Sequence, residues 1–439
     1  MFSDLLKFIS IQSVSTDSKR FPEILKAAEF LETKLKKLGF SVKFYQKPKT
    51  PPLVVATRII STQTKTIGIY AHYDVQPEDP ADEWESPPFL LTKRGKKLYG
   101  RGVADDKGHV IQIINATKHL IEQKELKNNL VLLFEGEEES GSVNFEEYVK
   151  EAKETLSKVD VFYVFDMGMF ATGIPQIEYG LRGLIDFELL LQTGIRDLHS
   201  GSYGNRVLNP ANVLADLFSQ MKDGATNKVL IPGFYDKVRS LDKKERLLLG
   251  GAERSGTAQK EEAGVFAVVD LDKIQPSLSA KILPSLDING IISGYTGEGS
   301  KTIIPKEARV KFSVRLVEYQ DPDATRSLIT NFIKKHLPEG VKYSIKIYSQ
   351  AAFFYTDVNN EYIQKTAKIL AKVFKNATRF NRSGGSVPAA ELVQRIFKKP
   401  VVLTGFISPD SHIHSPDENI DAEMFSKGTR AIEEILVNI

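Results

Sequence analysis

Five side chains that can bind a metal ion are spread along this chain at the ends of predicted strands and in loops. They are His72, Asp105, Glu139, Asp166 and His414. Imidazole nitrogen and carboxylate oxygen are the ligands that zinc and similar ions use where thiolates are absent, and the sequence contains no cysteine. Two ions that share one bridging carboxylate need about five protein ligands, so this set is sufficient for a two-metal site.

Each of these residues also has a structural explanation. Asp105 and Asp106 follow the glycine-rich segment 98–104 and precede a predicted helix, where Asp commonly caps the first turn. A histidine such as His72 can simply pack at a strand end, and Asp166 can cap a turn. The acidic run 137–139 can be a solvated loop. The residues must therefore be judged by their common position.

The elements that position these residues alternate between strands and helices. Strands are predicted at 40–44, 54–60, 66–71, 130–134 and 161–165, and helices at 22–38 and 106–123. This alternation predicts an α/β fold with a mixed, largely parallel sheet flanked by helices. His72, Glu138, Glu139 and Asp166 directly follow three of the strands, at the sheet edge where open α/β sheets bind their ligands.

A chain of 439 residues is too long for one ordinary core. Beyond about residue 178 the predicted elements are those of an α+β domain, with strands at 184–191, 309–316 and 342–348 and helices at 210–221 and 322–336. We therefore predict a catalytic domain of residues 1–177 and 386–439. Residues 178–385 are predicted to form an inserted lid or dimerisation domain.

Composition excludes several classes of partner. The chain has 41% hydrophobic and 26% charged residues, as in soluble globular proteins. Lys and Arg number 59 against 56 Asp and Glu, and no long block of one sign occurs, so neither nucleic acid nor an anionic membrane is expected as a partner. The first residues do not resemble a signal peptide, and we expect a cytoplasmic protein.

Several motifs resemble those of the dizinc metallopeptidase family that contains carnosine dipeptidase, glutamate carboxypeptidase and aminoacylase. The segments that carry the resemblance are HYD at 72–74, GRGVADDKG at 100–108, EGEEESGS at 135–142 and HS at 414–415. Three others are most similar to the carnosine dipeptidase branch: DLHSG at 197–201, FSVRLV at 312–317 and GGSVP at 384–388. The resemblance covers nearly the whole chain and is weak mainly over 207–300.

The resemblance implies that Asp105 bridges two Zn²⁺ ions, for which Mn²⁺ or Co²⁺ could substitute. One ion would also bind His72 and Asp166, and the other Glu139 and His414. Periodicity alone leaves His412 and His414 open as the last ligand. The resemblance favours His414, because His-Ser followed by the acidic stretch 417–419 matches the family pattern.

Other roles follow from the same resemblance. Glu138 matches the general base, which would take the proton of a water held between the ions. Asp74 matches the acid that orients the ligand histidine. The peptide bond between Asp105 and Asp106 is expected to be cis. Asp106 itself departs from the pattern, because the carnosine dipeptidase branch often has Asn there.

The residues that match substrate contacts are His199, Thr302, Arg315 and Ser386. In the relatives this histidine reaches the active site of the neighbouring subunit, so we expect a homodimer with His199 acting across the interface. Arg315 could hold the free α-carboxylate of a small peptide. Arg382 could be a further contact or a surface or structural arginine. The segment 348–350 lacks the histidine of the animal dipeptidases.

We therefore expect a metallodipeptidase that cleaves the amide bond of dipeptides. The alternative is an N-acyl-amino-acid deacylase of the acetylornithine or succinyl-diaminopimelate type, because it uses the same metal site on a different amide. A non-catalytic metal-binding protein is the third possibility. The presence of Glu138 and Asp74 argues against it, since a protein without turnover has no need of a base.

Overall fold

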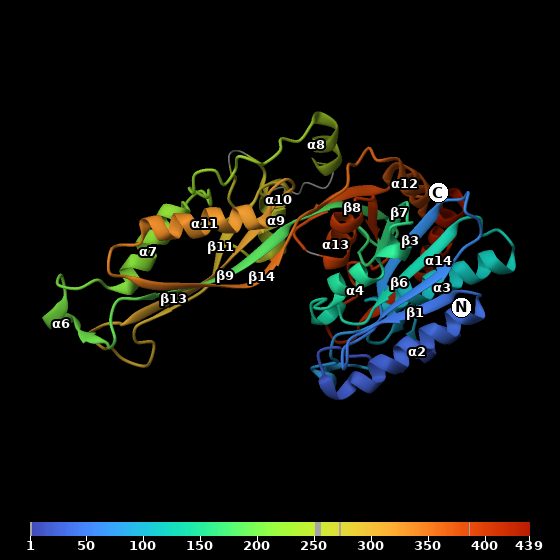
Figure 1. Ribbon diagram of the computed structural model, residues 1–439, viewed down its shortest axis with the longest axis horizontal. Helices are drawn as coiled ribbons and strands as arrows, with labels where there is room; N and C mark the ends of the chain where they lie inside the picture. Colours follow the sequence, from blue (N-terminus) through green and yellow to red (C-terminus); the bar gives the residue numbers. More distant parts are fainter. Residues whose placement is uncertain (1, 251–255, 272–273, 386) are drawn as a thin grey trace. The chain divides into compact units, whose positions relative to one another are not determined.

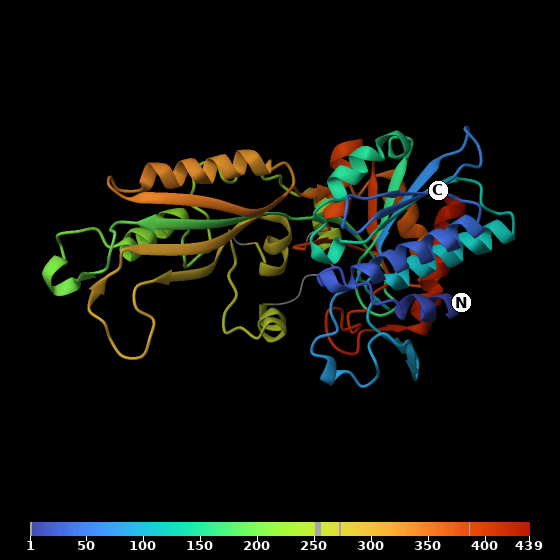
Figure 2. The same cartoon turned by 60° about the horizontal axis from the view of Figure 1, so that its bottom comes forward.

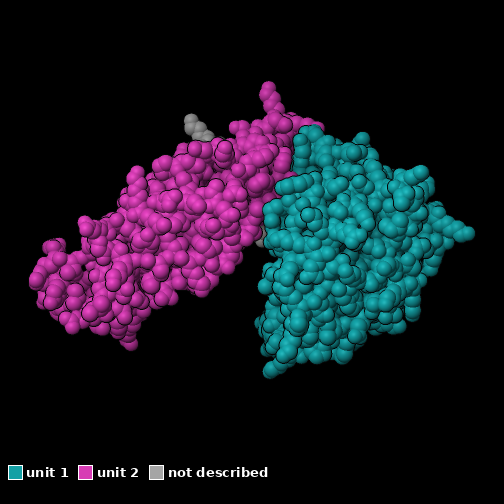
Figure 3. Space-filling model, in the orientation of Figure 1, with its two compact units in different colours: residues 1–179, 356–381, 387–439 teal, residues 180–355, 382–386 magenta. Residues whose placement is uncertain are grey.

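The computed structural model describes residues 2–250, 256–271, 274–385 and 387–439. The chain divides into two compact units (Figure 3). Unit 1 is Met1–Tyr179, Thr356–Asn381 and Val387–Ile439, and unit 2 is Gly180–Tyr355 and Arg382–Ser386. The division differs from the predicted domains over 356–381. That segment belongs to unit 1 because its helix α12, Glu361–Phe374, packs on the C-terminal helix α14, Ala422–Asn438.

The large sheet confirms the predicted α/β class. Within the described residues it has nine strands, in the order β1-β2-β6-β3-β7-β17-β8-β15 with β16 paired to β8. The four central strands β6, β3, β7 and β17 are parallel, and antiparallel strands flank them on both sides. The bounds are β1 Ser41–Tyr45, β2 Leu53–Arg58, β3 Thr66–His72, β6 Asn129–Glu135, β7 Val161–Phe165, β8 Gln176–Leu181, β15 Phe354–Tyr355, β16 Arg379–Ser383 and β17 Val401–Thr404.

Helices cover both faces of the central strands. Every residue of β3, β6 and β7 is buried, as expected for parallel strands between two helical layers. Figure 1 shows α4 and α13 on one face and α2, α3 and α14 on the other. The helices outside unit 2, besides α12 and α14, are α1 Ser3–Ile9, α2 Phe21–Lys37, α3 Lys107–Glu122, α4 Phe145–Glu151, α5 Lys153–Leu156 and α13 Pro388–Phe397.

A small antiparallel sheet joins two loops that carry candidate ligands. Its strands are β4 Thr92–Arg94, β5 Lys97–Tyr99 and β18 Asn419–Asp421, in the order β18-β5-β4. Strand β5 leads into the glycine-rich loop before Asp105, and β18 follows the loop that carries His414. Their pairing, for example Tyr99 with Asn419, therefore brings segments about 300 positions apart in sequence into register.

Unit 2 contains a four-stranded antiparallel sheet in the order β11-β13-β9-β14. Its strands are β9 Gly183–Gln192, β11 Ser285–Ser293, β13 Glu307–Leu316 and β14 Lys342–Ala351. Alternate residues of β9 and β13 are buried in a core with α7, Pro210–Met221, and α11, Pro322–His336. Figure 2 shows α11, in orange, running along one face of this sheet. The other face carries the more exposed residues that alternate with the core, most of them polar.

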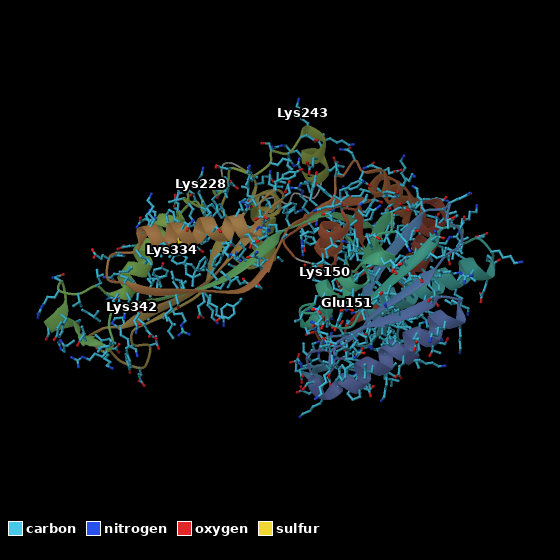
Figure 4. The ribbon with its side chains drawn as sticks, viewed as in Figure 1. Lys150, Glu151, Lys228, Lys243, Lys334 and Lys342 are labelled. Atoms are coloured by element: carbon cyan, nitrogen blue, oxygen red, sulfur yellow. The ribbon has the colours of Figure 1, made fainter. Side chains whose placement is uncertain are left out.

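The end of α11 illustrates how sequence sets an element's boundary. Lys334 lies in the last turn of α11, where a cation interacts favourably with the helix dipole. Pro338 follows two residues after the helix, and Lys342 begins β14 (Figure 4). The remaining elements of unit 2 are α6 Ser200–Tyr203, α8 Lys243–Gly250, α9 Gly256–Ala263, α10 Pro276–Ile282, β10 Leu198–His199 and β12 Ile303–Ile304.

The segment 222–300, for which the sequence analysis gave no helix or strand, contains three of these helices and the strand β11. Strand β11 has no clear alternation because its register shifts between Ile288 and Gly290, and Ile291 and Ile292 are both exposed. No helix of the described residues has the length and apolar character that a bilayer-spanning segment requires.

Candidate metal centre

Three of the candidate ligands lie at one edge of the parallel strands. His72 ends β3, Asp166 follows β7, and Glu139 lies in the short 3-10 helix Glu138–Ser140 (η3) that follows β6. His72 pairs with Glu135 in the parallel register of β3 and β6, so the carboxyl ends of these strands are level. This is the arrangement that the strand pattern predicted.

The other two candidates come from loops that meet at the same edge. Asp105 lies in the glycine-rich loop before α3, and His414 lies in the loop between β17 and β18. The Nε2 atom of His72 is 3.0 Å from Asp105 Oδ1, and the Nε2 atom of His414 is 3.1 Å from Asp105 Oδ2. The two oxygens of one carboxylate thus face two different histidines.

Each histidine also faces a second carboxylate. His72 Nε2 is 3.6 Å from Asp166 Oδ1, and His414 Nε2 is 3.3 Å from Glu139 Oε2. The donor atoms therefore form two groups that share Asp105, and within each group they lie within 4.8 Å of one another. Such a grouping is suited to two cations bridged by a single carboxylate.

The electrostatics of this edge favour bound cations. Burial raises the pKa of Asp166 to about 7, with the neighbouring aspartates adding to the effect and His72 opposing it. Burial also raises the pKa of Glu138 well above its ordinary value. Hydrogen bonds to Asp105 and Glu139 raise the pKa of His414 to about 10. These carboxylates crowd one small region, where desolvation disfavours their charged forms.

The donor set fits divalent metal ions by a further criterion. The Oε1 atom of Glu139 is buried and has no hydrogen-bond partner among the described residues. A buried carboxylate oxygen without a partner costs free energy unless something positive lies against it. Imidazole nitrogen and carboxylate oxygen are the donors that Zn²⁺ and Mn²⁺ accept.

Asp74 holds the loop that carries the proposed base. Its two carboxylate oxygens accept hydrogen bonds from the backbone N–H groups of Glu138 at 3.2 Å and Glu139 at 3.0 Å. The Nδ1 atom of His72 lies 3.1 Å from the backbone carbonyl of Asp74 and 3.4 Å from its carboxylate. The histidine is therefore oriented by the main chain of residue 74 as well as by its side chain.

A family model described as Peptidase family M20/M25/M40 matches residues 68–438. The chain belongs to this peptidase family. The resemblance deduced from the motifs is therefore confirmed, and with it a metallopeptidase rather than a metal-binding scaffold.

Curated relatives of the chain include several dipeptidases, two of which are described here. The Cys-Gly metallodipeptidase DUG1 of Candida albicans is 31% identical over 451 residues, covering 98% of this chain and 92% of that protein. The Beta-Ala-His dipeptidase of Homo sapiens is 31% identical over 389 residues, covering 87% of this chain and 76% of that protein.

Solved structures of the family are similar over the full length. An M20 family metallo-carboxypeptidase, Sso-CP2 from Sulfolobus solfataricus, has a TM-score of 0.85 and 33% identity, with 100% of this chain and 99% of that chain covered. The di-peptidase Dug1p from Saccharomyces cerevisiae has a TM-score of 0.77 and 28% identity, with 99% and 95% covered.

Glu418, which belongs to the acidic stretch 417–419, supports the loop that carries Asp105. Glu418 is fully buried, and its carboxylate accepts hydrogen bonds from the backbone N–H groups of Gly102 at 2.8 Å, Ala104 at 2.8 Å and Asp105 at 3.0 Å. It also accepts from Arg101 Nη1 at 2.9 Å. Glu418 therefore fixes the Asp105 loop to the segment that begins at His414.

Asp106 has a structural role that the sequence left open. Its Oδ2 atom accepts a hydrogen bond from the backbone N–H of His72 at 3.1 Å, and its Oδ1 atom pairs with His109 Nδ1. The Nε2 atom of His109 in turn accepts from the N–H of Phe406. The Asp105–Asp106 peptide bond is cis, which confirms the prediction.

The remaining candidates are His412, the alternative to His414 as a ligand, and the four predicted substrate contacts. His412 is exposed and does not belong to either donor group, whereas His414 belongs to one. Among the predicted substrate contacts, His199 is exposed on β10, Thr302 accepts through its carbonyl from Ser200 N–H beside β12, and Arg315 lies on β13. All three lie in unit 2. Ser386 lies outside the described residues.

Arg382 is a buried structural arginine rather than a surface residue. Its exposed fraction is 3%, and its Nη2 atom lies 2.5 Å from Glu318 and 3.2 Å from Glu245. Arg239 binds the same two glutamates, and both guanidinium groups lie over the ring of Tyr355. Two arginines and two glutamates thus form a neutral cluster within unit 2, in which Arg382 and both glutamates are buried and Arg239 is partly exposed.

Proposed function

We propose that this M20 chain is a metal-dependent dipeptidase that hydrolyses the amide bond of small peptides. The observation that supports this most directly is the placement of His72 and His414 on the two oxygens of Asp105, in a chain whose curated relatives include two dipeptidases. The proposed ligands are His72, Asp105 and Asp166 for one ion and Asp105, Glu139 and His414 for the other. Zn²⁺ is the proposed ion, with Mn²⁺ and Co²⁺ as substitutes.

Ions bound there would supply Lewis-acid chemistry, polarising the scissile carbonyl and acidifying a water. Glu138 takes a proton from the attacking water and returns it to the departing amine. Asp74 sets the position of Glu138, because its carboxylate accepts hydrogen bonds from the backbone N–H groups of Glu138 and Glu139. The raised pKa of Glu138, caused mainly by burial, suits a group that must both accept and donate a proton.

A substrate panel tests the proposal. It contains dipeptides, the matching tripeptides, and N-acetyl and N-succinyl amino acids, each assayed with Zn²⁺ or Mn²⁺ and again after chelation. We expect metal-dependent cleavage of dipeptides with little cleavage of the acyl amino acids. Preferential removal of the last residue from tripeptides and N-blocked peptides would instead assign carboxypeptidase activity, the activity named for the Sulfolobus relative. Cleavage of acyl amino acids alone would refute the proposal.

We also propose a homodimer in which His199 completes the site of the neighbouring subunit. Mixing inactive His199→Ala and Glu138→Gln chains tests this directly, because each heterodimer would contain one site with both residues intact. Random exchange should then restore roughly a quarter of wild-type activity. If His199 acts within its own subunit, the mixture stays inactive.

A further inference from the structure

A buried histidine in the first turn of α3 links two segments of the metal centre. The Nδ1 atom of His109 pairs with Oδ1 of Asp106, and its Nε2 atom lies 2.8 Å from the backbone nitrogen of Phe406. The other carboxylate oxygen of Asp106 accepts a hydrogen bond from the backbone N–H of His72 at 3.1 Å. A chain of hydrogen bonds therefore runs from the end of β3 through α3 to the segment that follows β17.

The geometry of this chain assigns the proton of the imidazole. A backbone N–H can only donate, so Nε2 of His109 is the acceptor in its contact with Phe406 and carries no proton. Burial lowers the pKa of His109 to about 4, so the ring is neutral at ordinary pH and its one proton lies on Nδ1. Both oxygens of Asp106 thus face donors, whereas an asparagine would turn its NH2 group toward one of them.

Aromatic rings hold the His109 imidazole in place. Its ring centroid lies 5.7 Å from that of Phe406 and 6.4 Å from that of Phe165. Phe374 packs on the ring of Phe406 at 5.8 Å, and all four side chains are buried. Phe165 ends β7 and directly precedes Asp166. A ring packed in this way presents its nitrogens in one fixed direction, which favours a persistent hydrogen bond to Asp106.

Asp106 brings this chain of hydrogen bonds to the metal ligands. One of its carboxylate oxygens lies within 4.8 Å of the donor atoms of His72, Asp105 and Asp166. Because each oxygen of Asp106 already accepts an N–H group, the carboxylate is suited to hold the backbone that carries a ligand. That backbone belongs to His72, whose Nε2 atom lies 3.0 Å from Asp105. Residues that orient a ligand in this way commonly change metal affinity by about 10- to 100-fold when they are removed.

Resting on the proposed function, we propose that His109 is a positioning residue of the metal centre. It holds the Asp106 carboxylate on the backbone N–H of His72 and so keeps the His72 imidazole directed at Asp105. The effect runs through the Nδ1–H group of His109 and through Asp106. Loss of that one donor should therefore weaken metal binding, whereas loss of the contact with Phe406 should affect only the stability of the fold.

Two amide variants separate the two contacts of His109. The amide nitrogen of asparagine lies near the place of Nδ1 and can donate to Asp106, whereas the longer glutamine can accept the N–H of Phe406 in place of Nε2. His109→Gln should raise the dissociation constant for Zn²⁺, measured by competition with a chelator, by roughly 10- to 100-fold and change the visible spectrum of the Co²⁺-loaded protein. His109→Asn should keep both close to the wild type but have the lower Tm. His119→Gln is the matched control, since His119 lies on the same helix with its side chain 48% exposed.

An Asp106→Ala background shows whether the effect runs through Asp106. In that background His109→Gln should cause no further loss of Zn²⁺ affinity. A further loss there, equal losses in the asparagine and glutamine variants, or wild-type affinity in His109→Gln would overturn the inference. If the wild type binds no metal, the proposed function fails. The inference on His109 is then decided by hydrogen exchange of the His72 backbone N–H, which should become faster in His109→Gln and not in His109→Asn; an unchanged rate in His109→Gln would overturn it.

Discussion

Replacing Glu418 by glutamine should destabilise the loop that presents Asp105. In the wild type one carboxylate oxygen accepts from Arg101 and the N–H of Gly102, and the other accepts from the N–H groups of Ala104 and Asp105. The NH2 group of glutamine would replace one of these oxygens. It would then face two hydrogen-bond donors and leave both without an acceptor. Leaving a buried donor unpaired costs about 1–3 kcal/mol, so two donors cost roughly 2–6 kcal/mol. The buried charge of Arg101 would also lose its partner.

The assays are thermal unfolding and metal affinity. For a unit of this size the loss corresponds to a Tm lower by roughly 5–20 °C. Because Asp105 would no longer be held between the two histidines, metal affinity should fall by about 10- to 100-fold. Asp410→Asn is the control, since its ion pair with Lys97 is 2.6 Å long but its side chain is 56% exposed. If Glu418→Gln matches this control in Tm and metal affinity, the argument that Glu418 positions Asp105 is refuted.

Three further predictions concern unit 1. Glu138→Gln should retain its metals and lose roughly 10²–10⁴ in kcat, and near-normal turnover would remove Glu138 from the mechanism. Chelation should abolish activity and lower the Tm, with both restored by added Zn²⁺ or Mn²⁺; activity that survives full metal removal would contradict the account. Burial raises the pKa of Glu135 from 4.5 to about 8, so the folded state holds this proton more tightly, and the free energy of unfolding should fall as pH rises from about 5 to 8. Glu135→Gln should lose less Tm over that range than the wild type, and an equal loss would show that Glu135 does not titrate there.

The fold of unit 1 could be predicted from the sequence because the patterns that indicate its strands lie within short segments. Runs such as 66–71 and 161–165 are apolar and strand-length, and they end at residues that can do chemistry. The observed strands Thr66–His72 and Val161–Phe165 lie within a residue or so of these predictions. The carboxyl-edge rule then places His72 and Asp166 at one edge with no further information.

Other features depend on contacts that a sequence does not display. Glu418 accepts hydrogen bonds from backbone N–H groups that lie more than 300 positions away in the sequence. The pairing of β18 with β5 brings these segments together. Residues 356–381 belong to unit 1 because the apolar stripe of α12 packs on α14. An amphipathic pattern predicts that a helix has a buried face but does not say which domain covers that face.

The central claim is that Asp105 bridges two cations held by four further side chains. Anomalous diffraction at the zinc edge, from crystals of the metal-loaded protein, tests it most directly. The account predicts two peaks flanking the Asp105 carboxylate, one between His72 and Asp166 and the other between Glu139 and His414. A single peak, or peaks that do not contact Asp105, would contradict it.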